Sequence, residues 1–174
     1  MKISLDSVKK LREMTSASVM ECKKAIQEAD GSMEKAVEIL RKRGLEIAAK
    51  KQGRAAKEGR VEAYVHMGNK IGVLIEVDCE TDFVARNSEF CQFTKDVAMQ
   101  VAASNPLYLS REDVPKDALA HIKDKEQFYK EHCLLEQLFI KDTSVAIKDY
   151  LVSIIAKIGE NISIRRFTRY KIGE

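Results

Sequence analysis

The sequence lacks the residue patterns by which most metal sites and nucleotide-binding loops are recognised. No Cys-x-x-Cys pair occurs among its four cysteines, which are Cys22, Cys79, Cys91 and Cys133. This excludes the common zinc and thioredoxin-like redox motifs. None of the three histidines stands at metal-ligand spacing from a cysteine or carboxylate, and neither common glycine-rich phosphate loop is present. We therefore expect a protein that is not an enzyme, with no catalytic residue, no metal and no cofactor.

The chain also has little net charge. Its 30 Lys+Arg and 27 Asp+Glu leave only +3, too little to indicate a nucleic-acid-binding protein from charge alone. The basic residues gather in residues 41–60, which is more often a solvated helix face. The alternative is an RNA-binding module that uses this stretch with Arg165 and Arg166. No aromatic stacking residues interleave with these charges, so we expect no direct nucleic-acid binding.

Long apolar segments are missing as well. The chain moves from its first residues directly into a helical pattern, without an apolar signal core or a run of membrane length. Hydrophobic residues nevertheless make up 45% of the sequence, enough to bury a core. We expect a cytoplasmic protein that does not bind a membrane.

The first 45 residues carry three short helical patterns. Ser18 and Ser32 are expected to cap the second and third helices, and Gly31 and Gly44 to end them. Helices this short are stable only when they pack on one another. The sequence therefore predicts a three-helix module over 1–45, followed by a basic, partly helical linker over 46–58.

Strand patterns begin after this linker. Residues 61–65 alternate in polarity, residues 71–77 are rich in β-branched residues, and Gly68-Asn69 between them indicates a hairpin. A third strand is expected over 162–172. Its alternation breaks after Arg165-Arg166, which predicts a bulge.

Helical spacing returns within the same region. We expect a helix from about 88 to 104, one with a weaker pattern from about 115 to 132, and the clearest one over 147–158. Candidate caps of the last are Asp142, Thr143 and Ser144. The predicted fold is α+β: a three-helix bundle, then a core of residues 59–174 in which helices pack a three-stranded antiparallel sheet.

One aromatic residue stands in an unusual place. Phe83 lies in a polar turn between the predicted strand 71–77 and the next helix. Its ring either folds back into the core or projects as an anchor for a partner protein, since aromatic side chains bring large contact area. The residues alone leave both alternatives open.

Several segments resemble the translation elongation factor Ts family, end to end and in order. They are residues 8–15, 20–26 and 28–31 near the N-terminus, the run Thr81-Asp82-Phe83-Val84-Ala85-Arg86-Asn87, and the later residues 134–142, 158–162 and 165–167. The resemblance implies a guanine nucleotide exchange factor for elongation factor Tu, with an N-terminal module of ubiquitin-associated-like fold. A ubiquitin-binding adaptor would rest on that fold analogy alone.

The resemblance also implies a set of residues that contact the partner's GTPase domain. The Asp82–Phe83 pair is expected to wedge beside the magnesium and phosphate site and release GDP. The full set of partner-binding residues implied by the family is Thr81, Asp82, Phe83, Val84, Val19, Met20, Lys51, Ile158 and Gly159.

The chain departs from the family pattern at three places. Ser16 and Ser18 stand where glycines are common, which implies a stiffer loop before the second helix. Gln100 stands where many relatives carry a histidine that contributes to the partner surface, so that contact is in doubt. The chain holds one copy of a core unit that longer relatives hold twice. Short members supply the second by dimerising, so we expect a homodimer through the sheet and the final helix.

Overall fold

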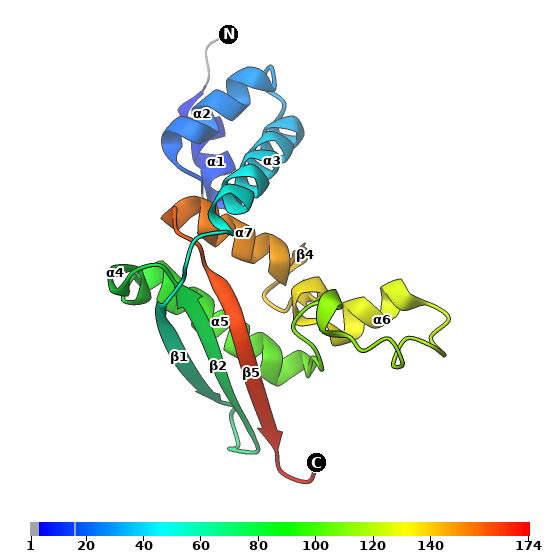
Figure 1. The fold of residues 1–174 in the computed structure, drawn as a ribbon. Helices are drawn as coiled ribbons and strands as arrows, with labels where there is room; N and C mark the ends of the chain where they lie inside the picture. The colour runs from blue at the N-terminus through cyan, green and yellow to red at the C-terminus, as the bar shows by residue number, and fades with distance from the viewer. Residues whose placement is uncertain (1–3, 16) are drawn as a thin grey trace. The chain divides into compact units, whose positions relative to one another are not determined.

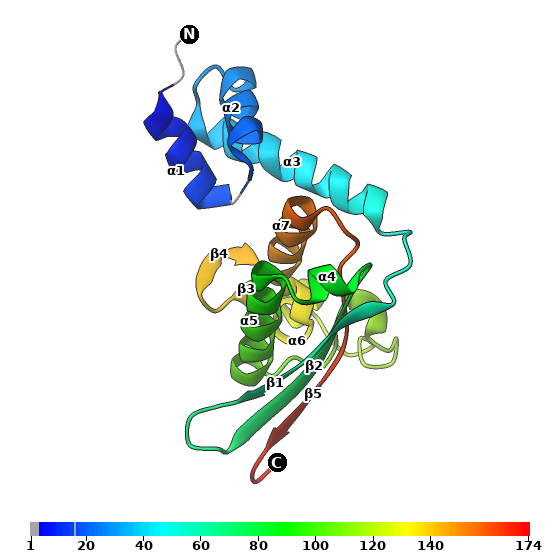
Figure 2. The same cartoon turned by 90° about the vertical axis from the view of Figure 1, so that its left-hand side faces the viewer.

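A computed structural model of the chain describes residues 4–15 and 17–174, and their contacts divide them into two compact units (Figures 1 and 2). The first unit lies within Met1–Ala55 and Val152–Asn161, and the second within Ala56–Leu151 and Ile162–Glu174. Ser16, one of the family departures, lies outside the described residues. The division into residues 1–45, 46–58 and 59–174 stays a prediction.

Three helices form the N-terminal part of the first unit: α1 (Leu5–Thr15), α2 (Val19–Glu28) and α3 (Met33–Lys51). Their facing stripes bury a small apolar core, made of Val8, Leu11, Cys22, Ala25, Ile26, Ala29 and Ala36. Ser18 caps α2 and forms a capping box with Glu21, and Ser32 caps α3, as expected of short hydroxyl side chains. The predicted bundle and both predicted caps are confirmed.

The prediction that Gly44 ends the third helix is wrong. α3 continues through Gly44 to Lys51 and so takes in residues predicted as linker. Gly44 is buried, and a Cβ built there would lie 3.4 Å from Val152 Cγ1 and 3.8 Å from the Ala156 Cβ of α7 (Ile147–Ile158). A Cβ at these distances would be in ordinary van der Waals contact, so α3 packs closely on α7 at Gly44, and this packing offsets the low helix propensity of glycine.

The second unit contains the predicted antiparallel sheet. Its strands are β1 (Glu58–Val65), β2 (Ile71–Cys79) and β5 (Ser163–Lys171), in the order β1-β2-β5. Gly68 and Asn69 form the turn between β1 and β2 with positive φ of 86° and 56°. Glu76 pairs with Arg166 whereas Val77 pairs with Ile164, so Arg165 is an extra residue in β5. The predicted hairpin and bulge are both confirmed.

One long helix, α5 (Ser88–Ser104), covers one face of this sheet (Figure 2). The buried residues of the contact are Val73, Ile75, Val77, Phe90, Phe93, Val97 and Val101. The opposite face of the sheet exposes apolar side chains, namely Val61, Val65, Leu74 and Tyr170. The confirmed fold class is therefore α+β, with helices on one side of a three-stranded sheet.

The connection from α5 to α7 differs from the prediction. Only α6 (Lys125–His132) is α-helical within the predicted helix 115–132, because Asp124 accepts a hydrogen bond from the Gln127 amide and caps a helix there. Residues before it form turns, preceded by the 3-10 helix η1 (Arg111–Asp113). The first half of that prediction is therefore wrong.

A second error concerns the residues expected to cap the last helix. Asp142, Thr143 and Ser144 lie in β4 (Asp142–Ala146), which pairs with β3 (Leu138–Phe139) after the 3-10 helix η2 (Leu134–Glu136). The Asp142 carboxylate accepts from the amide and hydroxyl of Ser144, so its capping capacity is used inside the hairpin. α7 begins after this hairpin, at Ile147.

Candidate partner-binding surface

The sequence between β2 and α5 folds into a single helical turn, α4 (Asp82–Ala85). The Thr81 hydroxyl accepts from the Val84 amide at 3.4 Å and so caps this turn. The Asn87 side chain then accepts from the Glu89 and Phe90 amides and caps α5. Two caps within seven residues fix the path of the chain at both ends of the turn, since each binds amides that a helix leaves unpaired.

Phe83 projects from this turn into solvent. Its side chain is 80% exposed, so the alternative that the ring folds back into the core is wrong. Beside it, the Asp82 carboxylate pairs with the Arg86 guanidinium at 2.8 Å. Thr81 is exposed and Val84 is half-buried. The structure thus gathers four of the predicted residues, Thr81–Val84, at one tip, at the end of the sheet opposite the β1–β2 hairpin (Figure 1).

Two thiols hold the backbone of this tip from beneath. The Cys79 thiol donates to the Thr81 carbonyl at 3.1 Å, and the Cys91 thiol to the Ala85 carbonyl at 3.6 Å. The sequence excluded the common metal and redox motifs for these cysteines and indicated no role for them at the tip. Cys79 is buried, as is usual for a cysteine. The contacts of both thiols with the tip depend on how β2, α4 and α5 pack together, which the spacing of residues in the sequence does not reveal.

A polar cluster continues from Cys91 towards β1. The Arg60 guanidinium donates to Glu62 at 2.7 Å and to the Cys91 sulfur at 3.4 Å, and the Thr94 hydroxyl donates to Glu62 at 3.4 Å. The hydrogen bond and charge of Glu62 raise the pKa of Arg60 above its usual value. Arg60 is therefore a fixed cation of the core unit, and its charge is already matched by a carboxylate.

The other five predicted residues lie in the first unit. Val19 and Met20 form the first turn of α2 and are 51% and 61% exposed, a pair of apolar side chains open to solvent. Lys51 is the last residue of α3, and Ile158 the last of α7. Gly159 follows with φ of +83° and nothing within 4 Å of a Cβ, so this position needs glycine for its backbone conformation and not for space.

Gln100 does not lie on a surface. It is fully buried near the end of α5, where its amide nitrogen donates to Ser104, Gln137 and the Leu138 carbonyl at 3.0–3.2 Å. Its amide oxygen accepts from the Ile140 amide at 2.9 Å. The side chain therefore pairs with the backbone of β3 and the residue after it, and its hydrogen-bonding capacity is used within the fold.

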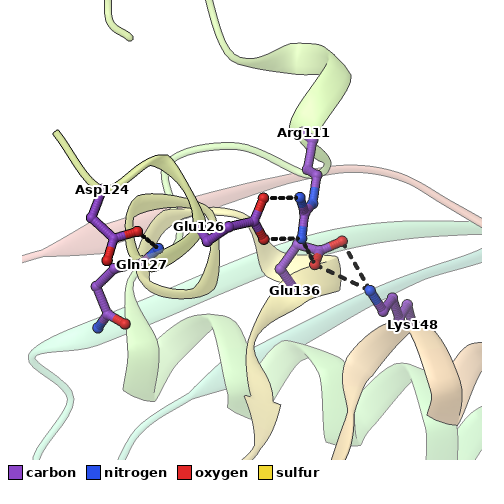
Figure 3. A network of polar contacts seen from close by, with 6 residues as sticks. All are labelled: Arg111, Asp124, Glu126, Gln127, Glu136 and Lys148. Carbon is purple, nitrogen blue, oxygen red and sulfur yellow. Dashed lines mark hydrogen bonds and ion pairs between the residues drawn. The ribbon is translucent and has the colours of Figure 1, made fainter. Parts of the chain in front are cut away.

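A second polar network lies beyond this end of α5, centred on Arg111 (Figure 3). The guanidinium pairs with Glu126 of α6 at 2.8 Å and with Glu136 of η2 at 2.7 Å, and Lys148 of α7 also binds Glu136. The Arg111 hydrogen bond holds the pKa of Glu136 below its usual range, against the opposing effect of burial. The network joins four elements, η1, α6, η2 and α7, and it contains none of the predicted site residues.

Two properties of the described chain bear on what this surface can bind. Within residues 4–15 and 17–174, no three His, Cys, Asp or Glu side chains are placed so that they could hold a metal ion. No helix in these same ranges has both the length and the apolar character to cross a membrane.

Comparison with known proteins decides the family. Residues 2–127 match the family model described as Elongation factor TS. The chain belongs to the elongation factor Ts family. It is 51% identical over 195 aligned positions to Elongation factor Ts of Carboxydothermus hydrogenoformans, with 99% of this chain and 90% of the relative covered.

Two further relatives agree. Elongation factor Ts of Thermotoga maritima is 51% identical over 195 positions, with 100% of this chain and 98% of the relative covered. That of Alkaliphilus oremlandii is 53% identical over 197 positions, covering 100% and 91%. This chain thus spans nearly the whole of each relative. Family membership makes it a translation elongation factor, a protein of protein biosynthesis.

Proposed function

We propose that the protein is a guanine nucleotide exchange factor for elongation factor Tu, which promotes GDP release during the elongation phase of protein synthesis. The observation that carries the proposal is the exposed Phe83 ring on a turn capped at both ends, within a family of translation elongation factors. A large apolar ring in water gains free energy when a partner covers it. A rigid base lowers the entropy lost on binding.

Exchange of this kind needs no catalytic group and no cofactor, and the protein is not an enzyme in the covalent sense. The ring of Phe83, with Asp82 beside it and Thr81 and Val84 supporting the turn, inserts into the GTPase domain and disturbs its magnesium and phosphate site. If the factor weakens GDP binding by some ratio, GDP must weaken binding of the factor by the same ratio. The factor therefore acts by preferring the nucleotide-free partner.

Further contacts to the GTPase domain come from the first unit. The exposed Val19 and Met20 side chains form one apolar contact, and Lys51, Ile158 and Gly159 at the ends of α3 and α7 form others. The protein works in the cytoplasm, without a membrane and without direct nucleic-acid binding. The ion pairs of Arg43 with Glu28 and of Arg60 with Glu62 support this last point, since they neutralise part of the basic stretch 41–60.

The protein is proposed to act as a homodimer. Support comes from the uncovered sheet face, where Val61, Val65, Leu74 and Tyr170 are 49–68% exposed, and from the single core unit. A second copy laid on this face would bury these side chains. Light scattering during gel filtration should give twice the 19.7 kDa chain mass, and Leu74→Glu should give the monomer.

The deciding experiment measures release of fluorescent GDP from purified elongation factor Tu. Catalytic amounts of this protein should accelerate release. Bound GDP should lower the affinity of elongation factor Tu for this protein by the same ratio by which this protein lowers its affinity for GDP. If release is no faster with the protein than without it, the proposal is wrong. RNA binding that is tight at low salt and falls steeply with added salt would support the nucleic-acid alternative instead.

A further inference from the structure

Arg86 is a charged residue next to the tip, and none of the predicted roles includes it. It ends α4 as the C-cap residue, and its guanidinium reaches back over the whole turn to Asp82 Oδ2 at 2.8 Å. Its side chain is 78% exposed and that of Asp82 is 46% exposed. The ion pair therefore lies on the solvent side of the tip, where Phe83 also projects.

Helix geometry places this pair directly beside the ring. Successive residues are separated by about 100° around a helix, so Asp82 and Arg86 share one side of α4 and Phe83 flanks both. A surface that accepts the Phe83 ring must also meet the Asp82–Arg86 pair. The tip presents an apolar ring bordered by a carboxylate whose position an arginine controls.

Apart from its two caps and the Cys79 and Cys91 thiols, the α4 turn is held by few hydrogen bonds of its own. Its backbone bonds include those from the Ala85 N–H to the Thr81 carbonyl at 3.2 Å, from Arg86 to Phe83 at 3.3 Å and from Asn87 to Val84 at 2.9 Å. One turn of helix is unstable without outside support, because few hydrogen bonds offset the loss of backbone freedom. Since α4 is only four residues long, a link from its first residue to its C-cap spans all of it.

From these contacts we infer that Arg86 is a positioning residue for nucleotide exchange, which holds the Asp82 carboxylate and the α4 turn in the conformation that the GTPase domain binds. This inference rests on the proposed function. Arg86 acts through Asp82: the guanidinium selects one carboxylate orientation in the free protein, so less freedom is lost when the partner binds. A surface pair without this role would affect only the local stability of the turn, and only slightly.

Loss of the Arg86 side chain should change the affinity for elongation factor Tu more than the maximal rate of GDP release. An exposed pair four residues apart on a helix contributes about 0.3–0.5 kcal/mol, which corresponds to about a twofold change in an equilibrium. Arg86→Met should therefore raise the concentration of factor needed for half-maximal GDP release by about twofold. Arg86→Lys, which keeps the charge, should restore part of this loss, and the difference should fade at high salt because both side chains are exposed.

The test is a double-mutant cycle of Arg86→Met with Asp82→Asn in the full-length protein, read by GDP release from elongation factor Tu. Arg86→Met should have no further effect once Asp82 has lost its charge. Lys42→Met is the matched control, because Lys42 pairs with Glu38 four residues away on exposed α3. The control should exchange GDP as the unsubstituted protein does.

Two outcomes would overturn the inference. Equal effects of Arg86→Met with and without the Asp82 charge would mean that Arg86 contacts the partner itself, and no effect in either background would mean that it has no role. Amide hydrogen exchange at Val84–Asn87 in the free protein gives a second readout, and these amides should exchange faster in Arg86→Met. If the unsubstituted protein fails to release GDP, the proposed function fails, while the hydrogen-exchange result still reports whether the pair orders the tip.

Discussion

The residues at the two ends of α5 depart from the usual burial preference in opposite ways. At its start, α4 exposes the aromatic ring of Phe83, and near its end Gln100 is fully buried. α5 has 17 residues and is therefore about 25 Å long. Its first residue and Gln100 are separated by most of that length. An apolar side chain left in water and a polar one removed from it both oppose the usual preference, and each needs its own explanation.

The explanations differ in kind. Gln100 is compensated within the fold, because Ser104, Gln137, Leu138 and Ile140 satisfy both ends of its amide. Phe83 has no such compensation within the described tip, where the turn is anchored through its backbone by Cys79 and Cys91 while the ring remains 80% exposed. The burial of Gln100 is thus explained by stability, and we propose that the exposure of Phe83 serves binding of the partner.

The largest effect is expected at the buried end. Gln100→Leu keeps the size of the side chain but leaves the Ile140 amide, the Leu138 carbonyl and Gln137 short of a partner. Unsatisfied buried groups cost about 1–3 kcal/mol each, so the free energy of unfolding should fall by about 2–4 kcal/mol. Urea denaturation measures this, with the exposed Gln127→Leu as the control that should change little. GDP release well below the unfolding transition should be unchanged, and a slowed release would place Gln100 in the exchange site.

A reversed pattern is expected at the tip. Phe83→Ala should slow GDP release about 30-fold or more, because a central aromatic anchor contributes about 2 kcal/mol or more to binding. The free energy of unfolding should change by less than about 0.5 kcal/mol, since the ring is exposed. Leu107→Ala, at the other end of α5 and 58% exposed, is the control for loss of an exposed apolar side chain. Normal release by Phe83→Ala would remove the tip from the proposed mechanism.

A smaller effect is expected on the pH dependence of stability, in the Arg111 network beyond the buried end of α5. Arg111 and Lys148 hold the pKa of Glu136 below its usual value of 4.5, so the ionised carboxylate stabilises the fold. This stability is present above about pH 4.5 and is lost as the pH falls through the lower pKa of the folded state. Glu136→Gln should therefore reduce the free energy of unfolding by about 1–2 kcal/mol at pH 7, and the difference should shrink below pH 4.

The same network supplies the control for that measurement. Glu126 binds the same guanidinium, but its side chain is 64% exposed against 13% for Glu136 (Figure 3). Glu126→Gln should therefore cost less than half as much, since exposed pairs contribute little. Equal losses from the two variants would show that burial does not decide the strength of this network. Neither variant should alter GDP release.

Sequence reasoning succeeded where one local pattern decides the structure. The β-branched run of β2, the Gly68-Asn69 turn and the bulge in β5 are local features, and each prediction is confirmed. It failed at Gly44 and at Asp142–Ser144, where contacts with a distant segment decide. A glycine inside a helix and an aspartate inside a hairpin are acceptable only because of partners that spacing does not reveal.

The candidate site divides in the same way. Resemblance located Phe83 and its neighbours, yet the residues alone could not say whether the ring was exposed, because exposure depends on how α4 meets β2 and α5. For Gln100 the resemblance implied a position on the partner surface and left that contact in doubt, and its burial depends on β3 and Ile140, which pair with its amide. The supporting thiols of Cys79 and Cys91 carried no sequence signal at all.

The smallest of the four effects tests whether stability and binding are separate at the start of α5. The Asn87 side-chain oxygen caps α5, and its backbone N–H, which alanine keeps, donates to the Val84 carbonyl, so the cap holds in place the residue that joins the helix to the tip. Asn87→Ala should cost about 1 kcal/mol of stability, as loss of an N-cap usually does, and should also slow GDP release severalfold because the turn that carries Phe83 loosens.

Ser32→Ala, which removes the N-cap of α3 in the other unit, is the matched variant. It should lose a similar stability without a change in GDP release. Urea denaturation and GDP release on both variants decide the point. If Asn87→Ala loses stability alone, the cap supports α5 only, and the tip keeps its conformation through Thr81, Cys79 and Cys91. If the two variants slow release equally, the loss of activity follows global stability, and the separation between the two ends of α5 does not hold.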